Sequence, residues 1–280
     1  MPGSTLLGSV RLFSFFSILA MLLPLYVFFY PLGRSVRRGL SWPFFRTCIA
    51  LTGLRLTISG MPGGPGSLFV CNHVSYLDIP ILASITDGIF VAKYEVGNWP
   101  LIGFLARIAG TIFVSRSAGK LRSERLAISK YLANGSSIFL FPEGSSSNGT
   151  GVLRFHSGLL SAVKMAPDQD VLVQPVSLVY GPRDTDGSIP SQIQRDCYAW
   201  HGNMTLAPHL WNVFCQREPF TVSVQFHRPQ SSCVFQTTRL LAIWSEKIVS
   251  AELESSFTQA NMVAQIRAKA PPTQGSGEPW

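Results

Sequence analysis

Hydrophobic residues gather in two long segments near the N-terminus and in a series of short runs after them. Residues 12–32 carry no charge, and the segment is long enough to cross a bilayer core. Residues 40–54 follow, with Arg46 as their single charge. This pattern predicts a spanning helix or a helical hairpin lying in one leaflet. A cleaved signal peptide is disfavoured, because the first segment is long for one and no A-x-A site follows it.

Basic residues lie on both sides of the first segment, and more of them follow it than precede it. Arg11 comes before it, and Arg34, Arg37 and Arg38 come after it. Basic flanks favour the cytoplasmic side of a membrane. The sequence therefore predicts attachment to the cell (inner) membrane, with the body of the protein on the cytoplasmic side.

After the turn-rich residues 60–66, short β-rich runs alternate with helix-like segments. Such alternation predicts an α/β fold with a mixed, largely parallel sheet flanked by helices. We expect membrane-anchoring helices over 1–58, one α/β domain over 59–255 and a C-terminal tail over 256–280, disordered at its end. The expected strands are 68–71, 89–92, 111–115, 137–141, 171–179 and 221–226, and the expected helices are 77–83, 101–109, 118–132, 158–165 and 237–253.

Composition and charge narrow the class of protein. Charged residues make up only 14% of the chain and hydrophobic residues 46%, which indicates association with a membrane. The net charge of +8 suits anionic lipid headgroups, phosphorylated substrates or an acidic partner. Nucleic-acid binding is disfavoured, because no dense basic run with interleaved aromatic residues occurs. The five cysteines are scattered without a CxxC pair, which is typical of reduced thiols.

The stretch NHVSYLD, residues 72–78, places a histidine directly after a strand-like run and an aspartate at the start of the next helix. A histidine takes a proton from a hydroxyl best when a carboxylate holds its other ring nitrogen. His73 and Asp78 are therefore a candidate base and its partner. The alternative is structural: Ser75 and Asp78 form a capping-box-like helix start.

Three further elements follow in order. The strand GTIFVSR ends in Arg116, whose guanidinium suits a phosphate, although a surface role is the alternative. The run FPEG ends a strand in a glycine-containing turn whose backbone N–H groups can bind an anion. The run VQPV places Pro175 inside a strand, which predicts a sheet edge or a bulge.

Together, NHVSYLD, GTIFVSR, FPEG and VQPV resemble the glycerolipid acyltransferase family, and specifically its 1-acylglycerol-3-phosphate acyltransferases, over roughly residues 67–229. The resemblance implies that His73 is the general base and Asp78 its orienting partner. It implies a phosphate contact for Arg116 and added positive charge from Lys93, for which a solvated strand end is the alternative. It also implies that Glu143, Gly144 and Ser145 shape the acceptor site.

The resemblance implies a membrane-bound enzyme that transfers a fatty-acyl group to the free hydroxyl of a lysolipid. The expected acceptor is 1-acyl-sn-glycerol 3-phosphate, and the expected donor is a thioester of coenzyme A or acyl carrier protein. Many members continue FPEG with Thr-Arg, whereas Ser145 and Ser146 follow here, so one phosphate-seeking cation is missing. The alternative acceptor is lyso-ornithine lipid or another lysolipid. Residues 200–209 also resemble a segment common among bacterial members, whichever of these acceptors they use.

Other classes of protein fit less well. A serine hydrolase needs a G-x-S-x-G elbow, which does not occur. A zinc protease motif such as HExxH is also missing, so no metal and no cofactor are expected. His156, His201, His209 and His227 are isolated in sequence, and structural or surface roles are expected for them. A membrane-tethered lipid-binding scaffold is the non-enzyme alternative, but a scaffold has no need of His73 in register with Asp78.

Overall fold

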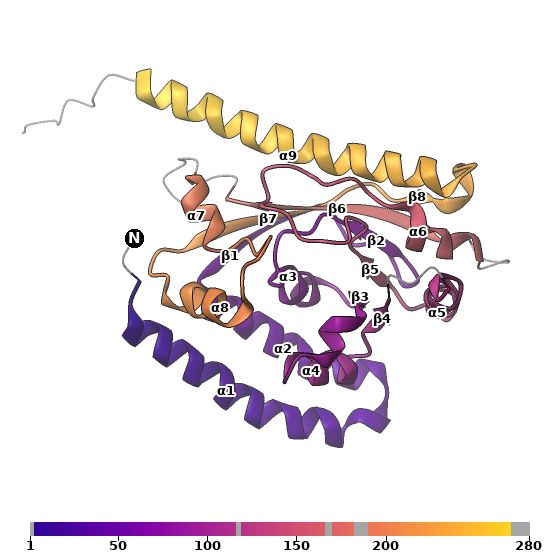
Figure 1. Ribbon diagram of the computed structural model, residues 1–280, viewed down its shortest axis with the longest axis horizontal. Helices are drawn as coiled ribbons and strands as arrows, with labels where there is room; N and C mark the ends of the chain where they lie inside the picture. The colour runs from indigo at the N-terminus through magenta and orange to yellow at the C-terminus, as the bar shows by residue number, and fades with distance from the viewer. Residues whose placement is uncertain (1–2, 116–118, 166–169, 182–189, 270–280) are drawn as a thin grey trace, which may run out of the picture.

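The computed structural model describes residues 3–115, 119–165, 170–181 and 190–269 (Figure 1). They form a sheet with the strand order β1-β7-β6-β2-β5-β3-β4, and β8 pairs with β6 beside β7. The strands are β1 (Leu54–Ser59), β2 (Leu68–Cys71), β3 (Ile89–Lys93), β4 (Ile112–Val114), β5 (Ile138–Leu140), β6 (Leu172–Tyr180), β7 (Phe220–Phe226) and β8 (Gln230–Ser231).

Five neighbouring strands, β6-β2-β5-β3-β4, run parallel to one another. Strand β7 is antiparallel to β6, and β1 is parallel to β7. The mixed, largely parallel sheet predicted from the alternation is therefore confirmed. Short parallel strands need helical crossovers, which accounts for the helix between most of them.

Helices cover both faces of the sheet, with α9 on one side and α1, α2 and α8 toward the other (Figure 1). Strand β2 is buried on both faces: Leu68 and Val70 face the core under α5, α6 and α9, and Phe69 and Cys71 face the core under α2, α3 and α8. Burial on both faces explains why β2 reads as an unbroken apolar run. The helices are α1 (Thr5–Phe28), α2 (Arg34–Thr52), α3 (Asp78–Ile85), α4 (Ile102–Ile108), α5 (Leu121–Ala133), α6 (Ser157–Leu160), α7 (Gln192–Asp196), α8 (Leu206–Cys215) and α9 (Thr238–Lys269).

The two N-terminal segments form helices α1 and α2, which pack against each other below the sheet (Figure 1). Helix α1 starts at Thr5, so Arg11 lies inside it and donates from Nη1 to the carbonyls of Phe214 and Gln216 at the end of α8. This contact ties the helix to the body. Among the residues that the structure describes, α1 alone is long and apolar enough to cross a membrane, by length and composition.

The domain limits and the anchoring role of residues 1–58 stay predictions, and the helices and strands that lie at those limits are as follows. The N-terminal helices end at Thr52, because residues 54–59 form β1 and pair with β7. Helix α9 continues past residue 255 to Lys269, and residues 270–280 lie outside the described part. Helices α7 and α8 were not predicted.

Pro175 lies in β6, which is a central strand and not an edge. The partner side of β6 is nevertheless interrupted there. Pairing with β7 ends at Val176 and Phe226, and pairing with β8 resumes at Val173 and Gln230. Two residues of β6 (174–175) thus face three of the partner (227–229), so the expected bulge is found on the neighbouring segment.

Candidate active site

The candidate site residues lie at one edge of the sheet. His73 follows β2, Glu143 follows β5, Lys93 ends β3 and Tyr180 ends β6. Since these strands are parallel, their carboxyl ends meet at the same edge, where open α/β sheets bind their ligands. Arg116 follows β4 in sequence and lies outside the described residues.

His73 and Asp78 make direct contact. Nδ1 of His73 lies 2.7 Å from Oδ2 of Asp78, and the Asp78 side chain is fully buried while that of His73 is 21% exposed. The same Oδ2 accepts the backbone N–H groups of Val74 at 2.8 Å and Ser75 at 3.1 Å. A carboxylate oxygen that accepts from all these groups fixes the imidazole as the Nδ1–H tautomer. Nε2 is therefore the ring nitrogen available to take a proton.

The alternative in which Ser75 caps helix α3 is wrong. The N-cap position is Leu77, and no side chain caps the helix. The hydroxyl of Ser75 is buried and has no hydrogen-bond partner among the described residues. Asp78 instead accepts the N–H groups that precede the helix, and in the same position it contacts His73. The aspartate closes the loop and orients the histidine at once.

Asn72 fixes the start of this loop. Its side-chain amide donates to the carbonyl of Leu178 at 2.9 Å and accepts the N–H of the same residue at 2.8 Å. This pair of bonds extends the ladder between β2 and β6 by one position beyond Cys71. Asn72 is fully buried, so an apolar replacement would leave two backbone groups of β6 without partners.

Glu143 supports the main chain of His73. Its Oε1 accepts the N–H of His73 at 2.9 Å, and its Oε2 accepts the N–H of Leu153 at 3.2 Å. Burial raises the pKa of Glu143 to about 8, against the opposing effect of these two hydrogen bonds. The glutamate of FPEG thus lies against the main chain of His73, where it joins the loop after β5 to the loop after β2.

The ring of His73 stacks on Phe141, with centroids 4.4 Å apart and planes 26° apart. Phe141 continues into a row of stacked aromatic rings, Phe90, Phe139 and Phe69, on neighbouring strands. This row holds one face of the imidazole against an apolar surface. The rotation of the ring is therefore limited from one side by packing and from its edge by Asp78.

The turn after FPEG closes over the same loop. Gly144 adopts φ +66°, and a Cβ atom there would meet nothing within 4 Å, so the backbone conformation alone favours glycine. The backbone N–H of Ser147 donates to the carbonyl of His73 at 2.9 Å. The hydroxyl of Ser146 donates to the carbonyl of Trp200. Ser145 is exposed beside them.

Residues 199–209 pack beside the histidine loop. The N–H of Trp200 donates to the carbonyl of Val74 at 3.0 Å, and the Trp200 ring packs edge-on against Tyr76. Nδ1 of His209 lies 2.9 Å from the hydroxyl of Tyr76, and its Nε2 lies 3.0 Å from the carbonyl of Ala199. Burial lowers the pKa of His209, which keeps it a neutral connector. The structural role expected for His209 is therefore found.

Sequence reasoning placed His73, Asp78, Glu143 and the FPEG turn together, and the structure brings them together. Lys93 lies two strands away from β2, at the same edge, and is half-buried. Sequence reasoning missed Asn72 and Tyr180, whose contacts join residues more than a hundred positions apart. The only local signal for Asn72 is its place between a buried strand and the histidine.

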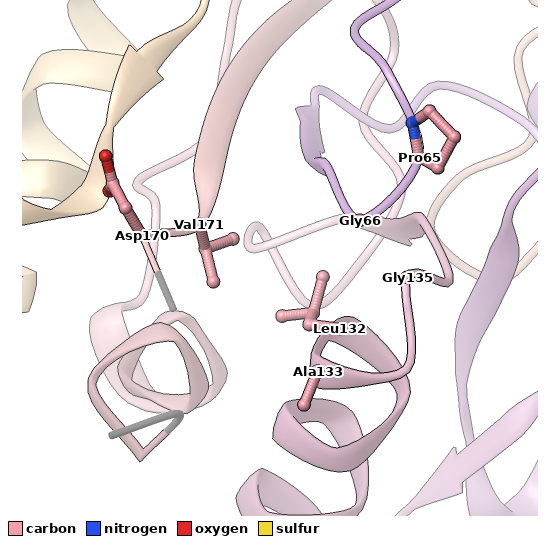
Figure 2. Close-up of a pocket in the computed structure, with 7 residues that line it drawn as sticks. All are labelled: Pro65, Gly66, Leu132, Ala133, Gly135, Asp170 and Val171. Carbon is pink, nitrogen blue, oxygen red and sulfur yellow. The ribbon is translucent and has the colours of Figure 1, made fainter. Parts of the chain in front are cut away.

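Two other features were candidates for a site: a group of metal-binding side chains and a surface hollow. The described residues contain no group of three or more His, Cys, Asp or Glu placed to hold a metal ion. An open hollow lies at the opposite, amino edge of the sheet, between α5 and the chain leading into β2 and β6 (Figure 2). Asp170, the one carboxylate among the described residues that line it, accepts the hydroxyl of Ser231. The hollow therefore lies at the edge of the sheet opposite to His73 and Asp78.

Comparison with known proteins identifies the family of the chain. Residues 55–179 match the family model described as Acyltransferase. The chain is 34% identical to a lyso-ornithine lipid O-acyltransferase of Rhizobium meliloti (strain 1021), over 69% of this chain and 68% of that protein. It is 29% identical to a 1-acyl-sn-glycerol-3-phosphate acyltransferase of Neisseria gonorrhoeae, over 76% of this chain and 84% of that protein.

The fold is also that of a solved structure, the 1-acyl-sn-glycerophosphate (LPA) acyltransferase PlsC from Thermotoga maritima. The TM-score is 0.62 at 22% sequence identity, over 95% of this chain and 98% of that chain. At this identity the similarity shows the fold alone. The similarity extends over the N-terminal helices as well as the sheet.

Proposed function

Because the chain belongs to the glycerolipid acyltransferase family, and is an enzyme that acylates lysolipids, we propose that His73 is its general base. One observation carries the proposal: Nδ1 of His73 lies 2.7 Å from Oδ2 of the fully buried Asp78. This contact leaves Nε2 to take the proton of an acceptor hydroxyl. A structural histidine would not need a buried carboxylate, two loop amides and a stacking ring to fix its tautomer.

The proposed reaction is direct transfer. The acceptor oxygen attacks the carbonyl carbon of the acyl thioester while Nε2 removes the hydroxyl proton. The C–S bond breaks, and the thiol leaves with a proton returned by His73. Asp78 stabilises the imidazolium that exists between the two proton transfers. Atoms and charge balance without a metal, a cofactor or an acyl-enzyme, so we propose that the thioester of coenzyme A or acyl carrier protein is the only co-substrate.

The acceptor that we favour is an amino-acid lysolipid of the lyso-ornithine type. Ser145 and Ser146 stand where a phosphate-seeking cation follows FPEG in many family members. Ser146 is bonded to the carbonyl of Trp200, which occupies this position with a neutral contact. The relationship to the Rhizobium meliloti enzyme supports the same acceptor.

A phosphate-bearing acceptor, 1-acyl-sn-glycerol 3-phosphate, is the second candidate. Lys93 at the end of β3 supports it, because a cation at the carboxyl edge suits a phosphate. Under this reading Arg116 would add a second cation. The relationship to the Neisseria gonorrhoeae enzyme supports this candidate.

We further propose that the hairpin of α1 and α2 lies in the cytoplasmic leaflet of the inner membrane. Large apolar side chains of α1 point away from the protein. Leu6, Phe13 and Phe28 are each 75% exposed. An apolar face of this size on one helix suits lipid. Arg37 stacks on Tyr30 at the turn of the hairpin, at the level where cations and aromatic rings meet headgroups.

The test is labelled acyl transfer by the purified full-length chain. Wild type, His73→Ala and the control His156→Ala are each given lyso-ornithine lipid and 1-acyl-sn-glycerol 3-phosphate. Each acceptor is tested with acyl carrier protein and coenzyme A donors. His156 is exposed and gives the same change of residue type outside the His73–Asp78 network.

Wild type and His156→Ala should transfer the acyl group, and His73→Ala should lose about 10²–10⁴-fold in kcat. Transfer to lyso-ornithine lipid alone supports the favoured acceptor, and transfer to the phosphate-bearing lysolipid alone supports the second. Substantial turnover by His73→Ala would remove His73 as the base.

A further inference from the structure

The carboxylate of Asp78 has a hydrogen-bond partner on each oxygen. Oδ2 accepts from His73 and from the two loop amides. Oδ1 accepts the phenolic hydroxyl of Tyr180 at 2.7 Å. Tyr180 comes from β6, whereas the other partners belong to the loop after β2. The phenol is thus the partner of Asp78 contributed from outside that loop.

Tyr180 is held firmly at this point. Its side chain is fully buried at the end of β6. The paired bonds of Asn72 with Leu178 join β6 to β2 two residues before it. Burial raises the pKa of Tyr180, and the nearby charge of Asp78 raises it further. The hydroxyl therefore stays protonated and can only donate toward Oδ1.

We propose that Tyr180 is a positioning residue of the active site, which acts through Asp78 by fixing the orientation of its carboxylate toward His73 and by drawing negative charge toward Oδ1. This inference rests on the proposed role of His73 as the base. It adds a third member to the pair, from a strand that carries none of the residues expected at the site from sequence.

The physical consequence has a direction. A hydrogen bond to one oxygen of a carboxylate disperses its negative charge and weakens its pull on a neighbouring cation. Without the phenol, Asp78 would hold the imidazolium form of His73 more strongly. The base would then become available only at higher pH. The acidic limb of the pH profile of kcat/KM should accordingly move upward when the hydroxyl is removed.

Other titratable groups face Asp78 and should stay unchanged across the comparison. Cys71, Glu143 and Tyr76 each lie near enough to interact electrostatically with Asp78 or with Tyr180. Burial raises the pKa of Cys71 and the pKa of Tyr76. Both groups therefore stay protonated over the pH range of the measurement. Glu143 titrates at about 8, so it affects the alkaline side of the profile in every variant alike.

The experiment compares Tyr180→Phe with Tyr198→Phe in the purified full-length enzyme. Tyr198 is 2% exposed, packs in the same core and stacks on Phe220. Its hydroxyl is buried and has no hydrogen-bond partner within the described ranges. Both substitutions remove one buried phenolic oxygen, but only one removes a bond to Asp78. The kcat/KM of acyl transfer is measured from pH 5 to pH 9, roughly the range in which histidines titrate.

We expect kcat/KM to fall about tenfold in Tyr180→Phe, the loss typical of a hydrogen bond to a charged group. Its acidic limb should move to higher pH, and Tyr198→Phe should match wild type in both respects. A site-specific 3-fluorotyrosine at position 180 keeps the fold and donates more strongly, so its limb should move to lower pH. An unchanged limb in both position-180 variants would overturn the inference.

The experiments distinguish a failure of the proposed function from a failure of the role of Tyr180. If wild type transfers no acyl group to any lysolipid, or if His73→Ala remains active, the proposed function fails. If wild type is active, His73→Ala is inactive and both position-180 variants have the profile of wild type, only the role of Tyr180 fails. Should Tyr180→Phe not fold, the fluorinated variant alone decides the matter.

Discussion

The two halves of the candidate site are built in opposite ways. In the half that holds the proposed base, Asn72, Asp78 and Tyr180 are fully buried, and hydrogen bonds join Asn72 and Asp78 to strand β6. In the half that we propose to face the acceptor headgroup, Gly144 and Ser145 are exposed on a turn. The first half belongs to the core of the sheet, whereas the second half lies on its rim.

We interpret this difference as a separation between the chemical step and the recognition of the headgroup. Every lysolipid acceptor presents a hydroxyl, so the proton transfer needs one geometry, and we propose that the buried network supplies it. Headgroups differ in charge and size, so the residues that meet them are placed where substitution costs little stability. We therefore expect changes in the buried half to lower the rate for all acceptors, and changes on the rim to alter the preference between them.

The largest effect is expected from Asp78→Asn in the buried half. The amide cannot accept from both loop N–H groups and from Nδ1 of His73 through one oxygen as a carboxylate does, and it does not stabilise an imidazolium. The kcat should fall by about 10³-fold or more for every acceptor. Asp87→Asn is the matched control, since Asp87 is exposed just beyond the other end of α3. Near-normal turnover of Asp78→Asn would show that the buried half does not carry the chemistry.

The second effect concerns stability and pH. Burial raises the pKa of Glu143 to about 8 in the folded state, from the ordinary value of 4.5 for a glutamate. The folded state therefore binds the proton more tightly, and this contribution to stability is present below pH 4.5 and is lost as the pH rises through about 8. At about 1.4 kcal/mol for each pH unit, the loss amounts to a few kcal/mol.

Chemical denaturation of wild type and Glu143→Gln at several pH values measures this effect. The free energy of unfolding of wild type should fall more steeply between pH 5 and 8 than that of the variant, which has no carboxyl group at this position. Parallel slopes would mean that Glu143 is not buried in its neutral form under the base.

A third prediction concerns the contact between helix α1 and the membrane. Phe13→Glu changes an apolar side chain of α1 that is 75% exposed. Its transfer out of lipid should weaken binding to anionic vesicles by about tenfold or more, because a buried Phe contributes roughly 1.5–3 kcal/mol. Ile243→Glu on α9 is the control, since Ile243 is 52% exposed on the other side of the sheet. Equal binding by the two variants would contradict a lipid-facing α1.

The smallest effect is expected from Ser146→Arg on the rim. The new guanidinium restores a cation after FPEG, and a charge-assisted contact of about 1–2 kcal/mol should raise kcat/KM for the phosphate-bearing acceptor about tenfold relative to lyso-ornithine lipid. Ser146→Ala separates this gain of charge from the loss of the bond to Trp200. If Ser146→Ala shifts the preference as much as Ser146→Arg, the hydrogen bond from Ser146 to Trp200, and not the missing cation, determines the acceptor.

Much of the central sheet could be predicted from the sequence, because its strands are short apolar runs between turns. The strand expected at 68–71 is found as β2 at the same residues, and the other five expected strands appear with shifted ends. Strand β1 was missed for a physical reason. Only Gly53 separates it from α2, so the sequence shows no turn between the helix and the strand. Its partner β7 lies more than 160 residues further along the chain, so no local pattern indicates the pairing.

In the candidate site, the motifs predicted which residues take part but not the hydrogen-bond network that joins them. The spacing of His73 and Asp78 predicts contact, whereas the bond from Glu143 to the main chain of His73 joins residues 70 positions apart and leaves no local pattern. Tyr180 looks like an ordinary strand residue in the sequence. Only the pairing of β6 with β2 brings its hydroxyl to Asp78. The prediction for Arg116 remains open, since the residue lies outside the described part.

The most direct test of the separation between base and rim is the acceptor preference of two variants. The ratio of kcat/KM for lyso-ornithine lipid to that for 1-acyl-sn-glycerol 3-phosphate is measured for wild type, Asp78→Asn and Ser146→Arg with one donor. The account predicts that Asp78→Asn slows both reactions and leaves the ratio unchanged, while Ser146→Arg shifts the ratio toward the phosphate-bearing lysolipid. A changed ratio in Asp78→Asn, or an unchanged ratio in Ser146→Arg, would contradict it.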